Sequence, residues 1–274
     1  MMKLSILLLL ALTLAACDGV IGPPNVVDVT QTSAESASTA TPAAAATTIA
    51  EPTGDAPAGF AEQVTIEAAD GLPIRATLLT PLTSGADPGV ILLHMLGDDR
   101  TVWGEVGLAA DLVAAGYAVL VVDMRGHGET GGTQDWTLAA DDLGRVWDDF
   151  TARDTVDATR TAVVGASIGA NMALRLGAER PDVGAVVLLS PGLDYRGVTT
   201  EDPLAIYGDR PLLLIASEDD AYSADSVRAL AEAVDGATVQ LYDYAGHGTN
   251  MFAAEPELTA LIIGWLGEQL AAGQ

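Results

Sequence analysis

The sequence contains few cysteine, lysine and aromatic residues. Cys17 is its only cysteine and Lys3 its only lysine, and aromatic residues make up 5% of the 274 positions. One cysteine forms no intrachain disulfide, and no group of His, Cys and Asp has metal-ligand spacing, so we expect neither a metal nor another cofactor. Twelve Lys and Arg against 38 Asp and Glu give a net charge of −26. This charge argues against nucleic acid as a partner and against docking on anionic lipid head groups.

The first part of the chain has the features of an export signal. After Lys3, residues 4–16 are almost entirely apolar, but the run is shorter than the about 20 residues that span a bilayer. It ends in Leu-Ala-Ala-Cys17, which resembles the lipobox of bacterial lipoproteins. We therefore predict a signal peptide over residues 1–16, acylation of Cys17, and an extracytoplasmic protein held on a bacterial membrane by its lipid. Residues 17–58, rich in Ala, Thr and Pro, are predicted to be a flexible tether.

From residue 59 to 274 the pattern predicts one folded domain. Two alternating segments around Asp70-Gly71 indicate a β-hairpin. Short runs rich in Val, Leu and Ile, typical of strands buried on both faces, follow at 90–93, 118–122, 162–164, 185–189, 212–215 and 239–241. Helical stretches are predicted at 105–115, 138–150, 168–178, 224–234 and 256–270. Strands separated by single helices predict an α/β domain with a mostly parallel sheet, whose chemistry gathers at the carboxyl ends of the strands.

One of these strand ends carries the pattern G-x-S-x-G. Residues 165–169 read Gly-Ala-Ser-Ile-Gly and lie between an apolar run and a helical stretch. A serine on such a tight turn has an exposed hydroxyl, and the flanking glycines are needed because side chains there would collide with the neighbouring strand and helix. The free amides at the start of the helix suit a developing oxyanion. Ser167 is therefore a candidate nucleophile.

Two further strand ends supply an acid and a base. The acidic cluster Glu218-Asp219-Asp220 follows the predicted strand at 212–215, and His247 lies in a glycine-containing loop after the last strand. The chain order Ser, Asp, His is one in which hydrolytic triads occur. In such a triad Ser167 would be the nucleophile, His247 the general base and then acid, and an aspartate would orient and stabilise the imidazole.

These motifs resemble those of the α/β-hydrolase superfamily, especially its small dienelactone-hydrolase-like and serine-esterase members. Besides residues 165–169, the segment Asp123-Met-Arg-Gly-His-Gly-Glu resembles the family's D-x-R-G-H-G-x-S loop, and His94-Met-Leu-Gly resembles its oxyanion segment. The resemblance implies a mostly parallel, twisted sheet of about eight strands flanked by helices. It also implies oxyanion donors at the amides of Ile168 and Leu96. Met95, where the family often has glycine, is the alternative to Leu96.

The resemblance also favours one acid of the cluster. The family's segment reads Pro, five apolar or small residues, Gly, two residues, then Asp. Counting from Pro211 places Ser217 at the glycine and Asp220 at the acid. A count shifted by one residue selects Asp219, which remains the alternative.

The function that these features predict is a serine hydrolase, most simply a carboxylesterase that works through an acyl-enzyme. A peptidase or acyltransferase on the same triad, or a non-catalytic envelope-binding lipoprotein, are the alternatives. Residues 190–210 leave room only for a small cap, so we expect a shallow site for small acyl substrates. Candidate residues for its apolar wall are Leu193, Tyr195, Ile206 and Tyr207, with Trp103 and Tyr222 beside them. A monomer is the default oligomeric state.

Overall fold

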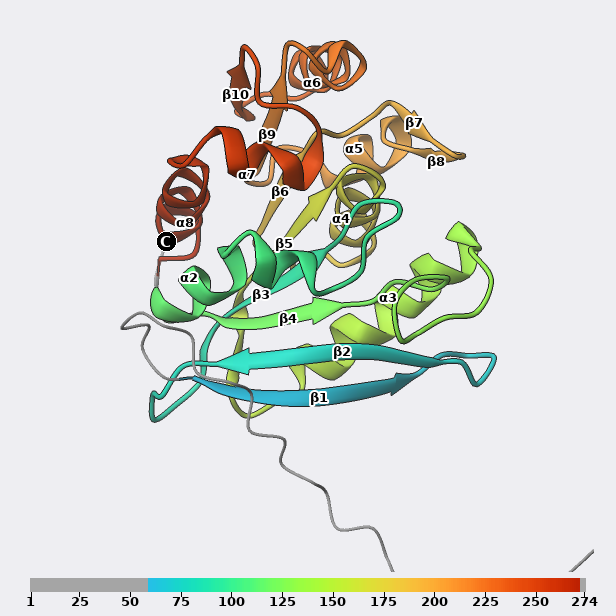
Figure 1. Ribbon diagram of the computed structural model, residues 1–274, viewed down its shortest axis with the longest axis vertical. Helices are drawn as coiled ribbons and strands as arrows, with labels where there is room; N and C mark the ends of the chain where they lie inside the picture. The colour runs from blue at the N-terminus through green and yellow to red at the C-terminus, as the bar shows by residue number, and fades with distance from the viewer. Residues whose placement is uncertain (1–58, 272–274) are drawn as a thin grey trace, which may run out of the picture. The chain divides into compact units, whose positions relative to one another are not determined.

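The computed structural model describes residues 59–271. The predicted signal peptide, Cys17 and the predicted tether up to residue 58 lie outside the described residues. In the described part, an eight-stranded sheet has the order β1-β2-β4-β3-β5-β6-β9-β10 (Figure 1). β1 and β2 are antiparallel to each other, β2 is antiparallel to β4, and the remaining neighbours are parallel. The predicted mostly parallel sheet of about eight strands is confirmed.

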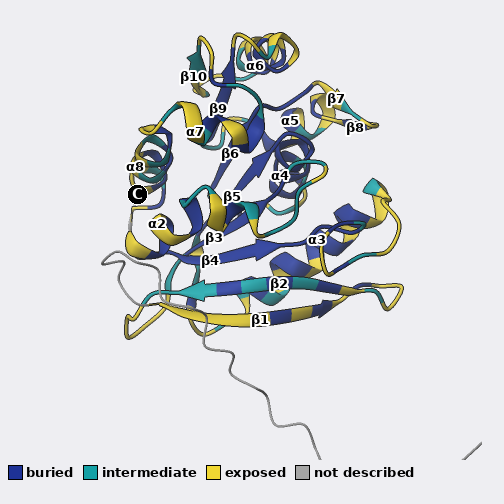
Figure 2. Cartoon of the chain, viewed as in Figure 1, coloured by how far each residue is buried: buried dark blue, intermediate teal, exposed yellow. Residues whose placement is uncertain are grey.

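The strand sequences explain where each strand lies in this sheet. β3 (Asp87–Leu93), β4 (Ala118–Val122), β5 (Val156–Ala166), β6 (Ala185–Leu189) and β9 (Leu212–Ser217) consist largely of buried apolar residues. They form the centre of the sheet (Figure 2). The outer strands β1 (Phe60–Glu67), β2 (Pro73–Thr80) and β10 (Thr238–Tyr242) carry exposed or half-buried positions. Continuous apolar runs thus occupy positions with both faces covered, and mixed runs occupy the edges.

Helices cover both faces of the sheet, and the sheet separates the apolar interior into two clusters. One face is covered by α3 (Trp136–Thr151), α4 (Ile168–Glu179) and α6 (Ala221–Ala233). The other is covered by α2 (Leu108–Ala114) and α8 (Leu258–Gln269), with the short α1 (Val102–Glu105) and α7 (Met251–Ala254). No helix among residues 59–271 is both long enough and apolar enough to cross a bilayer.

Two local features differ from the sequence-based prediction. The single helix expected at 105–115 is instead α1 and α2, because Gly107 between them has φ 83°, a left-handed conformation that interrupts a helix. The segment between β6 and β9 was predicted only as a small cap. It forms the two-stranded hairpin β7 (Asp194–Tyr195) and β8 (Val198–Thr199), followed by α5 (Glu201–Tyr207).

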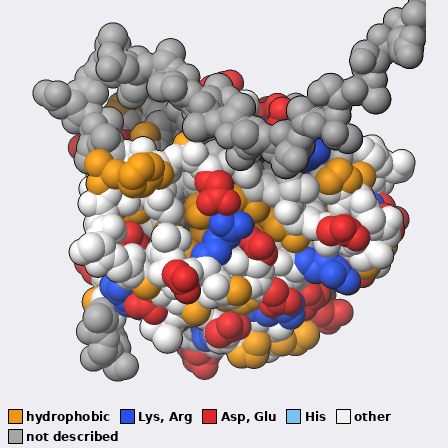
Figure 3. Space-filling model, turned by 90° about the horizontal axis from the view of Figure 1, so that it is seen from below, with side chains coloured by type: hydrophobic (Ala, Val, Ile, Leu, Met, Phe, Trp, Pro, Cys, Tyr) orange, Lys and Arg blue, Asp and Glu red, His pale blue; other side chains and the backbone are white. Residues whose placement is uncertain are grey.

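The face of the surface seen in Figure 3 carries its acidic groups beside basic ones rather than in one block. On the face seen in Figure 3, small groups of Asp and Glu side chains lie beside Lys or Arg side chains, and apolar patches separate them. The ion pairs fit this picture, as with Arg153, which pairs with Asp149 at 2.8 Å and Glu62 at 3.4 Å. Exposed pairs of this kind contribute little stability each, typically below about 1 kcal/mol.

Candidate active site

Ser167 lies on the turn between β5 and α4, at the carboxyl edge of the sheet. Its backbone has φ 55° and ψ −121°, values that a non-glycine residue rarely adopts. Both flanking glycines are required by close backbone contacts. A Cβ on Gly165 would lie 2.1 Å from the carbonyl oxygen of Gly169, and one on Gly169 would lie 2.4 Å from that of Leu93. The turn therefore holds the serine in a strained conformation because its neighbours have no side chains.

His247 contacts both of its expected partners. Its Nε2 lies 2.7 Å from Ser167 Oγ, and its Nδ1 lies 2.6 Å from Asp220 Oδ2. A carboxylate only accepts hydrogen bonds, so Nδ1 carries the proton and Nε2 is free to accept one from the serine hydroxyl. The structure thus brings Ser167, His247 and Asp220 together in one hydrogen-bonded chain, from loops that follow β5, β10 and β9.

The alternative acid, Asp219, binds the same loop at a different point. Its carboxylate accepts hydrogen bonds from the Ser217 hydroxyl and from the amide of Gly246, the latter at 3.2 Å. These hydrogen bonds, that of Ser217 above all, lower the pKa of Asp219. Asp219 therefore contacts the backbone beside His247, and Asp220 contacts the imidazole.

Two buried serines also hold the histidine loop. Ser217 Oγ accepts a hydrogen bond from the amide of Ala245 at 2.7 Å, and Ser190 Oγ accepts one from the amide of Gly248 at 2.9 Å. Both serines have 0% exposure, and Ser190 has φ 49°. Sequence reasoning placed Ser217 only as a substitute for the family glycine and missed Ser190. The one available signal for Ser190 was its place directly after the apolar run of β6.

One expected oxyanion donor, the amide of Ile168, directly follows Ser167, and the others lie in the segment after His94. Among the described residues, the amide of Ile168 and those of Met95 and Leu96 have no hydrogen-bond partner. His94 fixes the peptide between Met95 and Leu96, because its Nδ1 donates to the Met95 carbonyl at 2.8 Å. In a trans peptide the next N–H points the opposite way, so the Leu96 amide points away from His94. Leu96 remains the predicted second donor, and Met95 remains its alternative.

His94 is itself held by the loop after β4. Its Nε2 accepts a hydrogen bond from the amide of Met124 at 3.1 Å. The ring is therefore the neutral tautomer with its proton on Nδ1. Burial lowers the pKa of His94, which keeps the ring neutral. Asp123 is also fully buried, and its carboxylate accepts hydrogen bonds from the amides of Arg100 and Glu129, each at 2.7 Å. The segment that begins at Asp123 thus supports the site without entering it.

The predicted cap wall is only partly present. Tyr207 is in the core, with its hydroxyl donating to the Pro211 carbonyl at 2.7 Å, and Trp103 is fully buried in the cluster on the other face. Neither borders a cleft, because both are needed as packing. Leu193 and Ile206 are 44% and 69% exposed. Tyr195 lies against the site, with its ring centroid 6.2 Å from that of His247, and Tyr222 packs on Tyr195.

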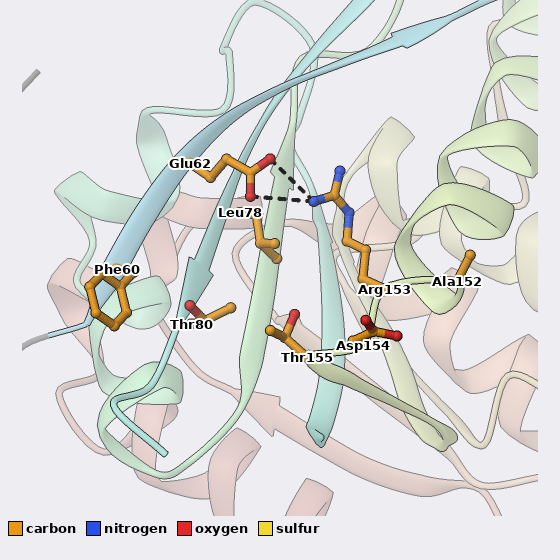
Figure 4. Close-up of a pocket in the computed structure, with 8 residues that line it drawn as sticks. All are labelled: Phe60, Glu62, Leu78, Thr80, Ala152, Arg153, Asp154 and Thr155. Atoms are coloured by element: carbon orange, nitrogen blue, oxygen red, sulfur yellow. Dashed lines mark hydrogen bonds and ion pairs between the residues drawn. The ribbon is translucent and has the colours of Figure 1, made fainter. Parts of the chain in front are cut away.

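A separate hollow of about 400 Å³ lies away from these residues, between β1, β2 and the loop after α3 (Figure 4). The ion pair between Glu62 and Arg153 crosses it. None of its lining residues belongs to the hydrogen-bonded chain around His247. Among the described residues, no group of three or more His, Cys, Asp or Glu could hold a metal ion.

The fold has counterparts among solved structures. An esterase of Pyrococcus furiosus superposes with a TM-score of 0.67 at 20% identity, covering 78% of this chain and 92% of the esterase. A dienelactone hydrolase of Anabaena variabilis has a TM-score of 0.61 at 22% identity, covering 77% of this chain and 96% of the other. The fold is that of the α/β-hydrolases. This is the fold that the motifs predicted.

Sequence comparison gives a partial match within this fold. Residues 86–207 match the family model described as serine aminopeptidase, S33. The matched range includes Ser167 and the oxyanion segment and ends before Asp220 and His247. An uncharacterised protein of Mycobacterium tuberculosis is 31% identical over 135 residues, which are 49% of this chain and 46% of that protein. A second, from Mycobacterium bovis, is 31% identical over 123 residues, 43% of this chain and 32% of its own length. The chain thus spans less than half the length of these curated relatives.

Proposed function

We propose that this chain is a serine hydrolase that cleaves carboxylic esters through an acyl-enzyme. The observation that carries the proposal is the continuous chain of hydrogen bonds from Ser167 Oγ through His247 to Asp220. The α/β-hydrolase fold and the match to a hydrolase family model support it. The partner-free amides of Ile168 and Leu96 supply the second requirement, donors for an oxyanion.

The reaction proceeds in two halves. Ser167 Oγ attacks the carbonyl carbon of the ester while its proton passes to His247 Nε2. The carbonyl oxygen becomes an oxyanion that accepts hydrogen bonds from the two amides. The C–O bond to the alcohol then breaks, and the alcohol leaves with the proton from His247. A water molecule attacks the acyl-serine, gives a proton to His247, and the acid is released as that proton returns to Ser167. Asp220 remains ionised and stabilises the imidazolium in both halves.

A peptidase on the same residues is the second candidate. The family model that matches residues 86–207 is described as serine aminopeptidase, and this description favours amide bonds. The two candidates share the acyl-enzyme and differ in the leaving group, an alcohol or an amine. Parallel assays on p-nitrophenyl esters and on amino-acid p-nitroanilides separate them, and we expect the esters to be hydrolysed faster.

Labelling by a fluorophosphonate probe tests the nucleophile. The full chain should be labelled and should hydrolyse short p-nitrophenyl esters, whereas Ser167→Ala should do neither. Ser226→Ala is a matched control and should retain labelling, because this buried serine of α6 hydrogen-bonds the Tyr222 carbonyl and the Leu193 amide and none of Ser167, His247 and Asp220. If Ser167→Ala is labelled as well as the wild type, the assigned nucleophile is wrong.

We further propose that the enzyme is exported and anchored by a lipid on Cys17. The support is the apolar segment 4–16 that ends directly at this cysteine. Expression in a bacterium with a clickable fatty acid should label the wild type and leave Cys17→Ser unlabelled. Labelling of Cys17→Ser, or equal recovery of both proteins in the soluble fraction, would contradict the anchor.

A further inference from the structure

Tyr195 is the cap residue that borders the triad. It lies on β7, which Figure 1 labels, and its ring stands at 90° to the imidazole of His247 with 6.2 Å between the centroids. Burial raises the pKa of its phenol, and the hydroxyls of Ser223 and Ser167 oppose that rise. The phenol is therefore neutral near pH 7 and belongs to a ring that lies beside the imidazole of His247.

The ring of Tyr195 is held mainly at its hydroxyl end. Its hydroxyl donates to the Ser190 carbonyl at 3.3 Å and forms a second hydrogen bond with Ser223 Oγ at 2.9 Å. The same end packs on Gly192, where a Cβ would lie 2.7 Å from Cε2 and Cζ of the ring. The Tyr222 ring meets it edge-on with 5.6 Å between centroids. An aromatic ring held in this way does not swing aside for a bulky group without losing these contacts.

The hairpin that carries Tyr195 is anchored to the helix that follows the nucleophile. Asn171, fully buried on α4, donates from Nδ2 to the carbonyls of Gly192 at 2.9 Å and Val198 at 2.7 Å. The hydroxyl of Tyr222 donates to the carbonyl of Asp194 and accepts its amide. The hairpin that carries Tyr195 is thus held by the buried Asn171 and by the half-exposed Tyr222.

We propose that Tyr195 determines substrate specificity, by closing the space beside Ser167 and so limiting the size of the group that the site accepts. This inference rests on the proposed ester hydrolysis. It deepens that proposal by naming the substrate class as esters of short-chain acids and alcohols. The cap residues Leu193 and Ile206 are 44% and 69% exposed, so we assign this role to neither of them.

The test compares Tyr195→Ala with Tyr195→Phe and with Ile206→Ala, a control on the same cap. Two substrate series are used, p-nitrophenyl esters of two- to sixteen-carbon acids and acetates of increasingly long alcohols. Tyr195→Ala should raise the ratio of kcat/KM for eight-carbon over two-carbon substrates by about 10-fold or more in at least one series, chiefly through KM. Tyr195→Phe keeps the ring and should leave the ratio near wild type, as should Ile206→Ala.

The outcomes separate this inference from the proposed function. Absence of ester hydrolysis and of fluorophosphonate labelling in the wild type would overturn the proposed function. An active wild type, with a folded Tyr195→Ala that keeps the wild-type ratio in both series, would overturn the size limit alone. A change in Tyr195→Phe as large as that in Tyr195→Ala would also overturn it, since the hydroxyl and not the ring would then be responsible. The midpoint of thermal unfolding of each variant shows whether the hairpin has remained folded.

Discussion

Asp219 and Asp220 are neighbours in the chain and bind neighbouring residues of one loop. The Asp219 carboxylate accepts a hydrogen bond from the amide of Gly246, and the Asp220 carboxylate accepts one from Nδ1–H of His247. The two carboxylates therefore act on the same loop in different ways, one through the backbone and one through the imidazole.

Asparagine at each position separates these actions. Asp220→Asn removes the charge that stabilises the imidazolium and offers an amide that disfavours the correct tautomer, so kcat should fall by about 10³–10⁴-fold. Asp219→Asn retains an acceptor oxygen for Gly246 and should lose at most about 10-fold. Steady-state kinetics on p-nitrophenyl acetate measure both. Equal losses, or a larger loss in Asp219→Asn, would mean that the roles are assigned the wrong way round.

The buried His94 should make stability depend on pH. Burial lowers its folded pKa below the ordinary value of 6.5, so the unfolded chain takes up a proton first as the pH falls. The stability that neutral His94 contributes is complete above pH 6.5 and is lost as the pH falls toward the folded pKa, at most about 1.4 kcal/mol per pH unit.

His94→Gln provides the comparison for this effect, because glutamine keeps a donor for Met95 and an acceptor for Met124 but does not titrate. Urea unfolding of both proteins between pH 8 and 5 should show the wild type losing more stability than the variant. Parallel curves would indicate that His94 does not supply the pH dependence in this window.

Gly169→Ala should destabilise the protein because the new Cβ has backbone on two sides. It would lie 2.4 Å from the Leu93 carbonyl oxygen and 2.5 Å from that of His94, so α4 must move away from the oxyanion segment. We expect a loss of about 1–3 kcal/mol in unfolding free energy and a loss of esterase activity. Gly264→Ala on α8, where the Cβ meets nothing within 4 Å, is the control and should be stabilising by about 0.5–1 kcal/mol. Equal effects of the two changes in urea unfolding would refute the steric argument.

Asn171→Ala should weaken the attachment of the cap hairpin. Besides its two donated hydrogen bonds, Asn171 accepts the amide of Gly192 at 3.1 Å, and its removal leaves buried backbone groups without partners. We expect a cost of about 2–3 kcal/mol. Arg175→Ala on the same helix removes only an exposed ion pair with Glu179 and should cost less than about 0.5 kcal/mol. Comparable unfolding midpoints for both variants would contradict this function of the buried amide.

The sequence predicted the strands well because central strands have a simple signature. The apolar runs at 118–122 and 185–189 coincide with β4 and β6, since strands covered on both faces consist of apolar residues throughout. The helix expected at 105–115 was misjudged because its break depends on the backbone conformation of Gly107, which local propensity does not reveal.

The site was predictable where chemistry restricts the residue type. Ser167 and His247 follow from their glycine turns and chain order, and the structure brings them within hydrogen-bond distance. The choice between Asp219 and Asp220 depended on a count that could slip by one residue. Ser190 and Asn171 were missed because ordinary polar residues become supports only through partners distant in the chain.

The two apolar clusters have a consequence for how the serine keeps its place. Along β5, Val163 faces one cluster and Val164 the other, and both are fully buried. Residues 162–166 are apolar on both faces, so within this part of the strand polarity does little to oppose a slip by one residue. What opposes it is volume, since large and small side chains would exchange sides. Exchanging Ala162 with Val163, which leaves hydropathy unchanged, therefore threatens the alignment of the nucleophile more than many polar changes on the surface.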